Sequence, residues 1–373
     1  MCKTIICLST KLQITLLILE NTLLISENMT IPLSKEIWLR PTMDKATVEE
    51  EVVMSEVHLG CPPHYSGPYF STFNISLPPS SEVELVGRNF DGVRGGEPTS
   101  TEQVISLDDD GDLILTRRSE DSKNKFVMVI QHNITSSIPS VGLQVWRAEL
   151  VLADYVMHKI FKSSDFAEVI VAELGAGTGL AGMLLARVAK KVFLTDHGDE
   201  VLDNCAQNVH LNSGRFSASV KVRELDWKAS WPPLEKCSSS QRRYNWTSKE
   251  LEEFQRASIL VAADVIYNDD LTDAFFSTLE RIMSRSPDKV LYMALEKRYN
   301  FTLDDLSVVA NGYSHFRKYL RTARGEDAEC EDSHNESSPC FVGTCIDLTQ
   351  IPQYVKEYER GEDVEIWEIK YRK

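Results

Sequence analysis

The chain has 373 residues, a length typical of two or three domains. Hydrophobic residues make up 42% of it and charged residues 26%, which excludes a wholly disordered or fibrous protein. The formal net charge of −16 argues against non-specific binding to nucleic acid, because the phosphates would repel an acidic surface.

Cysteine spacing and hydropathy narrow the class of protein further. No pair of the eight cysteines has the C-x-x-C spacing of a zinc site or a thioredoxin motif. The apolar stretch Leu16-Leu17-Ile18-Leu19 is interrupted by Glu20 and is too short to span a membrane. These features favour a soluble intracellular protein over a secreted one.

The hydrophobic pattern divides the chain near residue 140. Before it, short apolar runs between turn-rich stretches predict loops, a few strands and partial disorder. The acidic run Asp108-Asp109-Asp110-Gly111-Asp112 does not fit an EF-hand, because Ser106 and Arg117 take the first and last ligand positions, and we interpret it as a solvated linker. We expect an N-terminal extension over 1–140 and one folded domain over 141–373.

Strands and helices alternate regularly after residue 140. Trp146, Leu150 and Met157 recur at helical spacing and predict a helix. Near-continuous apolar strands separated by helices follow, which predicts a parallel sheet covered on both faces. The predicted strands are Val169–Leu174, Lys191–Asp196, one that ends at Trp227, Ile259–Asp264 and Val290–Leu295. The alternating stretch Val364–Tyr371 predicts a half-exposed antiparallel strand.

A glycine-rich turn after the first of these strands is compatible with two cofactors. Ligands of open parallel sheets bind at the carboxyl ends of the strands. Gly177, Gly179 and Gly182 satisfy the bare dinucleotide pattern G-x-G-x-x-G. Glu173 followed by Gly175, Gly177 and Gly179 satisfies the pattern of an S-adenosylmethionine site. An acid before the turn would repel a pyrophosphate but suits a ligand with an ammonium and a sulfonium, so we favour S-adenosylmethionine; a tight turn without a ligand is the third alternative.

The next three strands also end in acids. Asp196 can accept hydrogen bonds from ribose hydroxyls, which fits either cofactor. Asp226 can accept from an adenine amino group and Trp227 can stack beside the ring, although Trp227 also suits the core. Asp264 either lies over the transferred methyl group or caps the next helix.

Five ordered motifs follow one another after residue 141: Gly142-Leu143-Gln144-Val145-Trp146-Arg147, Glu173-Leu174-Gly175-Ala176-Gly177-Thr178-Gly179-Leu180, Thr195-Asp196, Glu224-Leu225-Asp226-Trp227 and a D-x-x-Y from Asp264 to Tyr267. With them, about three-fifths of the chain resembles the seven-β-strand protein-lysine methyltransferases of the methyltransferase-like group. The resemblance implies an α/β, Rossmann-like, seven-stranded class I methyltransferase sheet, mostly parallel with one antiparallel strand.

The motifs and the resemblance together give a set of expected site residues. Asp264 and Tyr267 are expected where the substrate lysine enters, as the catalytic residues. Glu296 matches an acidic position of the family with a structural or substrate-orienting role. The residues expected to bind S-adenosylmethionine are Trp146, Glu173, Gly175, Ala176, Gly177, Asp196, Asp226, Trp227 and Ala263.

The resemblance implies methyl transfer from S-adenosylmethionine to the ε-amine of a lysine in a protein, without a metal. A methyltransferase for a non-protein acceptor, a non-catalytic cofactor-binding interaction module and a nicotinamide oxidoreductase are the alternatives. The N/D-P-P-Y motif of base-amine methyltransferases lacks its prolines, since Val265 and Ile266 stand there. We expect a nucleic-acid-associated or chaperone-like protein substrate, no direct nucleic-acid or membrane partner, a monomer, and a location in the nucleus or cytoplasm.

Overall fold

The computed structural model describes residues 52–58, 68–77, 125–233, 243–302, 307–322 and 341–372. These residues all belong to one compact unit, residues 50–373. The expected acidic linker at 108–112 lies outside the described residues, and so does the disorder expected in its surroundings. The division at residue 140 stays a prediction.

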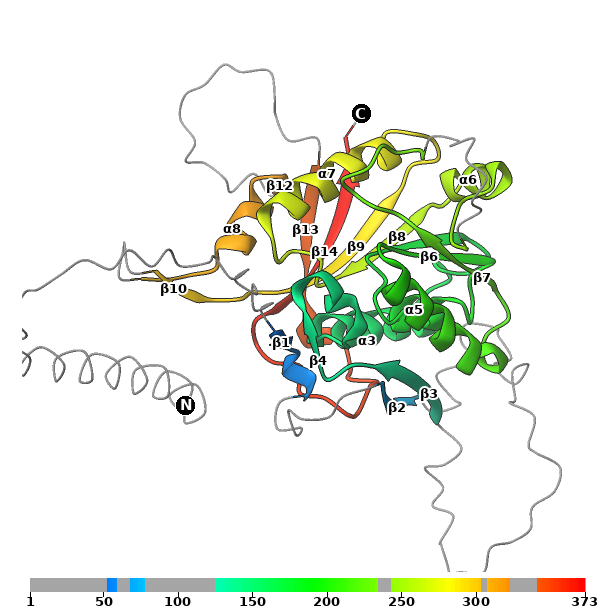
Figure 1. The fold of residues 1–373 in the computed structure, drawn as a ribbon, viewed down its shortest axis with the longest axis horizontal. Helices are drawn as coiled ribbons and strands as arrows, with labels where there is room; N and C mark the ends of the chain where they lie inside the picture. The colour runs from blue at the N-terminus through cyan, green and yellow to red at the C-terminus, as the bar shows by residue number, and fades with distance from the viewer. Residues whose placement is uncertain are drawn as a thin grey trace, which may run out of the picture. The chain divides into compact units, whose positions relative to one another are not determined.

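An eight-stranded sheet forms the centre of this unit, in the order β12-β13-β14-β9-β8-β5-β6-β7 (Figure 1). Neighbouring strands run parallel, except that β14 is antiparallel to both β13 and β9. The predicted mostly parallel sheet with one antiparallel strand is therefore confirmed, and the three-residue edge strand β12 adds an eighth strand to the expected seven. The strands are β5 (Ile170–Leu174), β6 (Lys191–Asp196), β7 (Ser219–Glu224), β8 (Ile259–Ala263), β9 (Val290–Glu296), β12 (Leu320–Thr322), β13 (Phe341–Ile346) and β14 (Val364–Tyr371).

The C-terminal strand β14 is not half-exposed, as its alternation predicted, but lies inside the sheet. Ile366 belongs to the hydrophobic core on one face, and Trp367 and Ile369 belong to the core on the other. All three are at most 2% exposed. Both faces of the strand are thus packed into cores, so the alternation does not mark an exposed face here.

Helices cover both faces of the sheet. α3, α4 and α5 pack into one core, and α6, α7 and α8 pack into the other. A capping box opens α6, because Thr247 Oγ1 accepts from Glu250 N while the Glu250 carboxylate accepts from Thr247 N. The helices are α3 (Arg147–Lys162), α4 (Leu180–Leu185), α5 (Asp199–Leu211), α6 (Ser248–Gln255), α7 (Asp269–Met283) and α8 (Asn311–Arg317), with 3-10 turns η6 (Ser213–Arg215) and η7 (Leu348–Gln350).

Short strands also precede residue 140, as expected. β1 pairs with β4 and β2 pairs with β3, both antiparallel. Asn208 of α5 and Asn212, the residue that follows the helix, hold β3: Asn208 Oδ1 accepts from Gln131 N at 2.7 Å and Asn212 Oδ1 from Val129 N at 3.0 Å. This part of the chain therefore packs against the main domain. Its elements are β1 (Val52–Met54), η1 (Glu56–His58), β2 (Tyr69–Ser76), β3 (Lys125–His132), β4 (Thr135–Ser137) and η5 (Ile138–Leu143); β10 (Asn300–Thr302) and β11 (Ser307–Val309) form a hairpin after β9.

Candidate functional site

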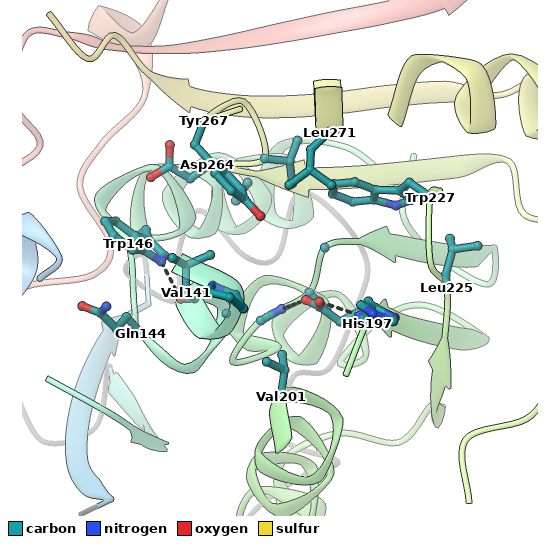
Figure 2. Close-up of a pocket in the computed structure, with 18 of the residues that line it drawn as sticks. Val141, Gln144, Trp146, His197, Val201, Leu225, Trp227, Asp264, Tyr267 and Leu271 are labelled. Atoms are coloured by element: carbon teal, nitrogen blue, oxygen red, sulfur yellow. Dashed lines mark hydrogen bonds between the residues drawn. The ribbon is translucent and has the colours of Figure 1, made fainter. Parts of the chain in front are cut away.

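A cavity of about 420 Å³ opens at the carboxyl ends of β5, β6 and β8 (Figure 2). β6 and β7 lie on one side of β5, and β8 and β9 lie on the other. The cavity therefore sits at the switch in strand order, where open α/β sheets bind ligands. Glu296 does not line it, whereas all the predicted cofactor-binding and catalytic residues do: Trp146, Glu173, Gly175, Ala176, Gly177, Asp196, Asp226, Trp227, Ala263, Asp264 and Tyr267. The role of each in binding or catalysis stays a prediction.

The turn after β5 brings backbone close to its neighbours and needs glycine. Gly175 has φ +70° and Gly177 has φ +50°, a region that residues with a side chain rarely adopt. A Cβ on Gly175 would lie 2.8 Å from Val265 Cγ1, and one on Gly177 would lie 3.0 Å from the Gly142 carbonyl oxygen. A side chain at either position would therefore displace the cavity wall.

Gly182, which completed the alternative dinucleotide pattern, has a packing role. It lies within α4, where a Cβ would come within 2.2 Å of Leu194 Cδ2 and 2.5 Å of Glu173 Oε2. Its N–H donates to Glu173 Oε2 at 2.9 Å. Close packing of α4 on the sheet therefore explains this glycine without a bound phosphate.

Two buried acids, Glu149 and Glu173, accept hydrogen bonds from the first turn of α4 and from the residues just before it. Glu149 Oε1 accepts from Thr178 Oγ1 at 2.8 Å and from Leu180 N at 3.0 Å. Burial raises the pKa of Glu149 to about 7 and that of Glu173 well above its usual value. The sequence predicted no role for Glu149, because an acid in the first turn of a helix is usually a solvated one.

Strand-end residues of β6 and β7 form another wall of the cavity. Asp196 accepts from Gly177 N and from His197 N, both at 2.7 Å, and burial raises the pKa of its carboxyl. The Trp227 ring packs edge-on against Phe275, with 5.0 Å between centroids, and also lines the cavity. Trp227 thus combines the core contact and the cavity position that the sequence left as alternatives.

Asp264 follows β8 in a backbone conformation that is rare for a residue with a side chain. Its φ is +55°, and strain of this kind is typical of functional sites. It does not cap α7, because Asn268 Oδ1 accepts from Leu271 N at 3.0 Å instead. Its Oδ2 pairs with Arg298, while Oδ1 is buried without a hydrogen-bond partner in the described part of the chain. Burial raises the pKa of Asp264, and the Arg298 guanidinium opposes that rise.

Tyr267 lies at the mouth of the cavity. The residue is 40% exposed, and Figure 2 shows its ring directed into the cavity from the loop after β8. Trp146 lies nearby, with its indole N–H donating to the Val141 carbonyl at 2.9 Å. The indole is thereby fixed as a wall, next to the two residues predicted for the substrate lysine.

The charge of the lining suits a cationic ligand. The acidic residues that line the cavity are Glu149, Glu173, Asp196, Asp226 and Asp264. The basic residues in the same lining are Lys228 and His197. A pyrophosphate needs free backbone N–H groups at the glycine turn, but the Asp196 carboxylate already accepts from Gly177 N. The residues present therefore fit S-adenosylmethionine, whose ammonium and sulfonium find carboxylates and whose adenine finds an indole.

Within the described residues, no group of three or more His, Cys, Asp or Glu side chains is placed to bind a metal ion. The expectation that the reaction uses no metal stays a prediction. No helix in the same part of the chain has the length and apolarity needed to cross a membrane.

Comparisons with known proteins give one family. The lysine methyltransferase family model matches residues 122–244 and 234–310. Methyltransferase-like protein 22 of Mus musculus is 30% identical over 88% of this chain and 98% of its own length, and that of Homo sapiens is 29% identical over 88% and 96%. Protein N-lysine methyltransferase METTL21A of Xenopus tropicalis is 28% identical over 52% of this chain and 80% of its own.

Proposed function

The chain belongs to the lysine methyltransferase family, and from this premise we propose that it transfers a methyl group from S-adenosylmethionine to the ε-amine of a lysine in a protein substrate. The observation that carries the proposal is the acid-lined cavity at the carboxyl ends of the strands, with Asp264 and Tyr267 at one side. That lining matches a cationic cofactor and a cationic substrate side chain.

S-Adenosylmethionine, when bound, supplies an electrophilic methyl group on a sulfonium. We assign the ribose hydroxyls to Asp196, the adenine amino group to Asp226 and the adenine face to Trp227, all of which line one part of the cavity. Gly175 and Gly177 leave the room at the turn that the cofactor's amino-acid part requires.

The protein must also provide a neutral amine. A free lysine is neutral in only about one molecule in a thousand at pH 7.4, which corresponds to about 4 kcal/mol. A partly dry channel lowers the pKa of a lysine because burial disfavours the ammonium. Asp264 Oδ1 accepts no hydrogen bond from the residues that the structure describes and can accept one from an amine, and Tyr267 narrows the channel, so the two hold the nitrogen in line with the methyl group.

Transfer of radiolabelled methyl groups into the proteins of a cell lysate tests this function. Asp264→Ala should reduce turnover by about 100-fold, because the amine loses its orientation. The affinity for S-adenosylhomocysteine should stay close to that of the unchanged protein. Asp165→Ala, which removes an exposed acid paired with Lys159, is the control and should keep full turnover. Equal turnover in Asp264→Ala would remove Asp264 from the mechanism.

The resemblance to the methyltransferase-like group supports a nucleic-acid-associated or chaperone-like protein as the substrate, and a location in the nucleus or cytoplasm. Mass spectrometry of the labelled band identifies the substrate, and imaging of the tagged full chain gives the location. We propose a monomer, which light scattering of the purified protein tests. A labelled membrane or secreted protein would contradict these assignments.

A further inference from the structure

Residues 52–58 are hydrogen-bonded to the wall of the cavity. They lie outside the part of the chain that matches the family model. Ser55 N donates to Gln144 Oε1 at 2.7 Å, and Gln144 Nε2 donates back to the Val53 carbonyl at 3.1 Å. The Ser55 hydroxyl donates to the Val145 carbonyl. Ser55 and Gln144 are at most 1% exposed, and Gln144 lines the cavity. This segment therefore has a fixed position beside the site.

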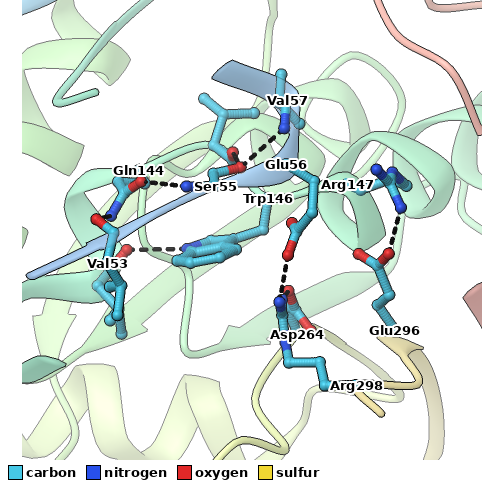
Figure 3. A network of polar contacts seen from close by, with 12 residues as sticks. Val53, Ser55, Glu56, Val57, Gln144, Trp146, Arg147, Asp264, Glu296 and Arg298 are labelled. Atoms are coloured by element: carbon cyan, nitrogen blue, oxygen red, sulfur yellow. Dashed lines mark hydrogen bonds and ion pairs between the residues drawn. The ribbon is translucent and has the colours of Figure 1, made fainter. Parts of the chain in front are cut away.

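Glu56 reaches from this segment into the polar network around Asp264 (Figure 3). The Arg298 guanidinium donates through Nη1 to Glu56 and through Nη2 to Asp264. Its Cζ also lies 4.9 Å from the centroid of the Trp146 ring. One planar cation thus joins Glu56, the predicted catalytic acid and a predicted cofactor-binding indole.

The network holds one more carboxylate than it holds guanidinium groups. Three carboxylates, those of Glu56, Asp264 and Glu296, face the two guanidinium groups of Arg147 and Arg298. Each carboxylate keeps one buried oxygen that has no hydrogen-bond partner among the described residues: Glu56 Oε2, Asp264 Oδ1 and Glu296 Oε2. Unpaired buried carboxylate oxygens are costly. Of the three residues, Asp264 lines the cavity, so its Oδ1 is the oxygen that faces the side from which a substrate amine arrives.

We propose that Glu56 is a positioning residue of the substrate site, which acts through Arg298 to hold Asp264 and supplies part of the negative charge that attracts the substrate lysine. The inference rests on the proposed lysine methyltransferase function. The inference makes residues 52–58 part of the substrate site.

Glu56 also affects the pH at which Asp264 ionises. The charged and titratable groups around Asp264 are Glu56 from η1, Arg147 and Glu149 from α3, Tyr267 from the loop after β8, and Glu296 and Arg298 at the end of β9. Among them Glu56 raises the pKa of Asp264, and it raises that of Glu296 as well. Removal of the Glu56 charge should therefore let Asp264 ionise at lower pH.

The test measures kcat and KM for the labelled substrate protein between pH 5 and 9, with the full chain. In Glu56→Gln we expect KM for the substrate protein to rise about tenfold, since one charged partner is lost. We also expect the acid limb of kcat/KM to move to lower pH by about one pH unit. The affinity for S-adenosylhomocysteine should not change, and Glu56→Asp should recover most of both effects. Glu252→Gln, which neutralises an exposed acid on α6, should behave as the unchanged protein.

Three outcomes overturn the inference while they leave the function in place. The first is a Glu56→Gln protein with the KM and pH profile of the unchanged protein. The second is a loss of S-adenosylhomocysteine affinity in Glu56→Gln as large as the rise in KM, because a general disturbance of the fold would then explain both. The third is a Glu56→Asp protein as impaired as Glu56→Gln. If the unchanged protein transfers no methyl group to protein, the proposed function fails instead.

Discussion

Burial raises the pKa of the Glu149 carboxyl, which should leave a pH signature in the stability of the protein. The pKa rises from 4.5 to about 7, so the stabilisation is fully present below about pH 4.5 and is lost as the pH rises through 7. In Glu149→Gln the amide oxygen can still accept from Thr178 and Leu180. The variant should be more stable than the unchanged protein at pH 8, by up to about 3 kcal/mol, and equally stable near pH 4.

Urea unfolding at both pH values measures this difference. Glu252→Gln, an exposed acid, is the matched control and should show no such pH dependence. A Glu149→Gln protein that is less stable than the unchanged one at pH 8 would show that the carboxylate is ionised and needed in the folded state.

Loss of the Asp196 side chain should weaken the binding of the cofactor selectively. It holds the glycine turn through Gly177 N, and we assign the ribose hydroxyls to it. Asp196→Ala should reduce the affinity for S-adenosylhomocysteine by about 10- to 100-fold, the range for hydrogen bonds to a charged group. Calorimetry measures this affinity, with Asp165→Ala as control; an unchanged affinity would refute the assignment.

At the scale of elements, one buried carboxylate of α3 holds the segment before β14. Asp154 is 0% exposed and accepts from Tyr354 N at 2.7 Å, from Val355 N at 2.8 Å, from the Tyr358 hydroxyl and from Arg360 Nη2 at 2.7 Å. Asp154→Ala leaves these donors without their acceptor and should lower the free energy of unfolding by about 3–5 kcal/mol.

Urea unfolding of Asp154→Ala and of the surface variant Asp165→Ala tests that expectation. Asp165→Ala should lose at most about 1 kcal/mol, because an exposed ion pair contributes little. A loss in Asp154→Ala no larger than that of the control would mean that the segment is held by its apolar contacts alone.

The elements also show what a sequence can predict. Apolar runs between helical segments identified the parallel strands that carry the site, although β7 ends at Glu224 and not at Trp227 as predicted. Parallel strands place their carboxyl ends at one edge. The acids that follow these strands could thus be predicted to meet. The three-residue strand β12 has no such pattern. The alternation of β14 predicted an exposed face, and this prediction was wrong. Helices cover both faces of the sheet at this strand, which only the tertiary structure reveals.

The residues that the sequence did not predict are those brought to the site by long-range contacts. Glu56 and Arg298 lie 242 positions apart, and no local pattern links them. Glu149 lies in a helical turn like that of many surface acids. Its burial depends on how α3 packs against α4.

At the scale of the whole molecule, cofactor binding should stabilise the fold. A ligand that binds only the folded state at 100 times its Kd adds about 2.7 kcal/mol to the free energy of unfolding. S-Adenosylhomocysteine should produce this effect, and NAD should not, because five acids line the cavity. Urea unfolding with each ligand measures this stabilisation. Stabilisation by NAD alone would favour the interpretation of the glycine turn as a dinucleotide site.

The most direct test of the central claim is the chemical identity of the methylated product. After transfer from radiolabelled S-adenosylmethionine into lysate proteins, the labelled band is hydrolysed to amino acids, which are separated beside standards. A lysine methyltransferase gives its label as ε-N-methyl-lysine, and Asp264→Ala gives almost none. Label in methylarginine, in nucleic acid or in a small molecule would contradict the account.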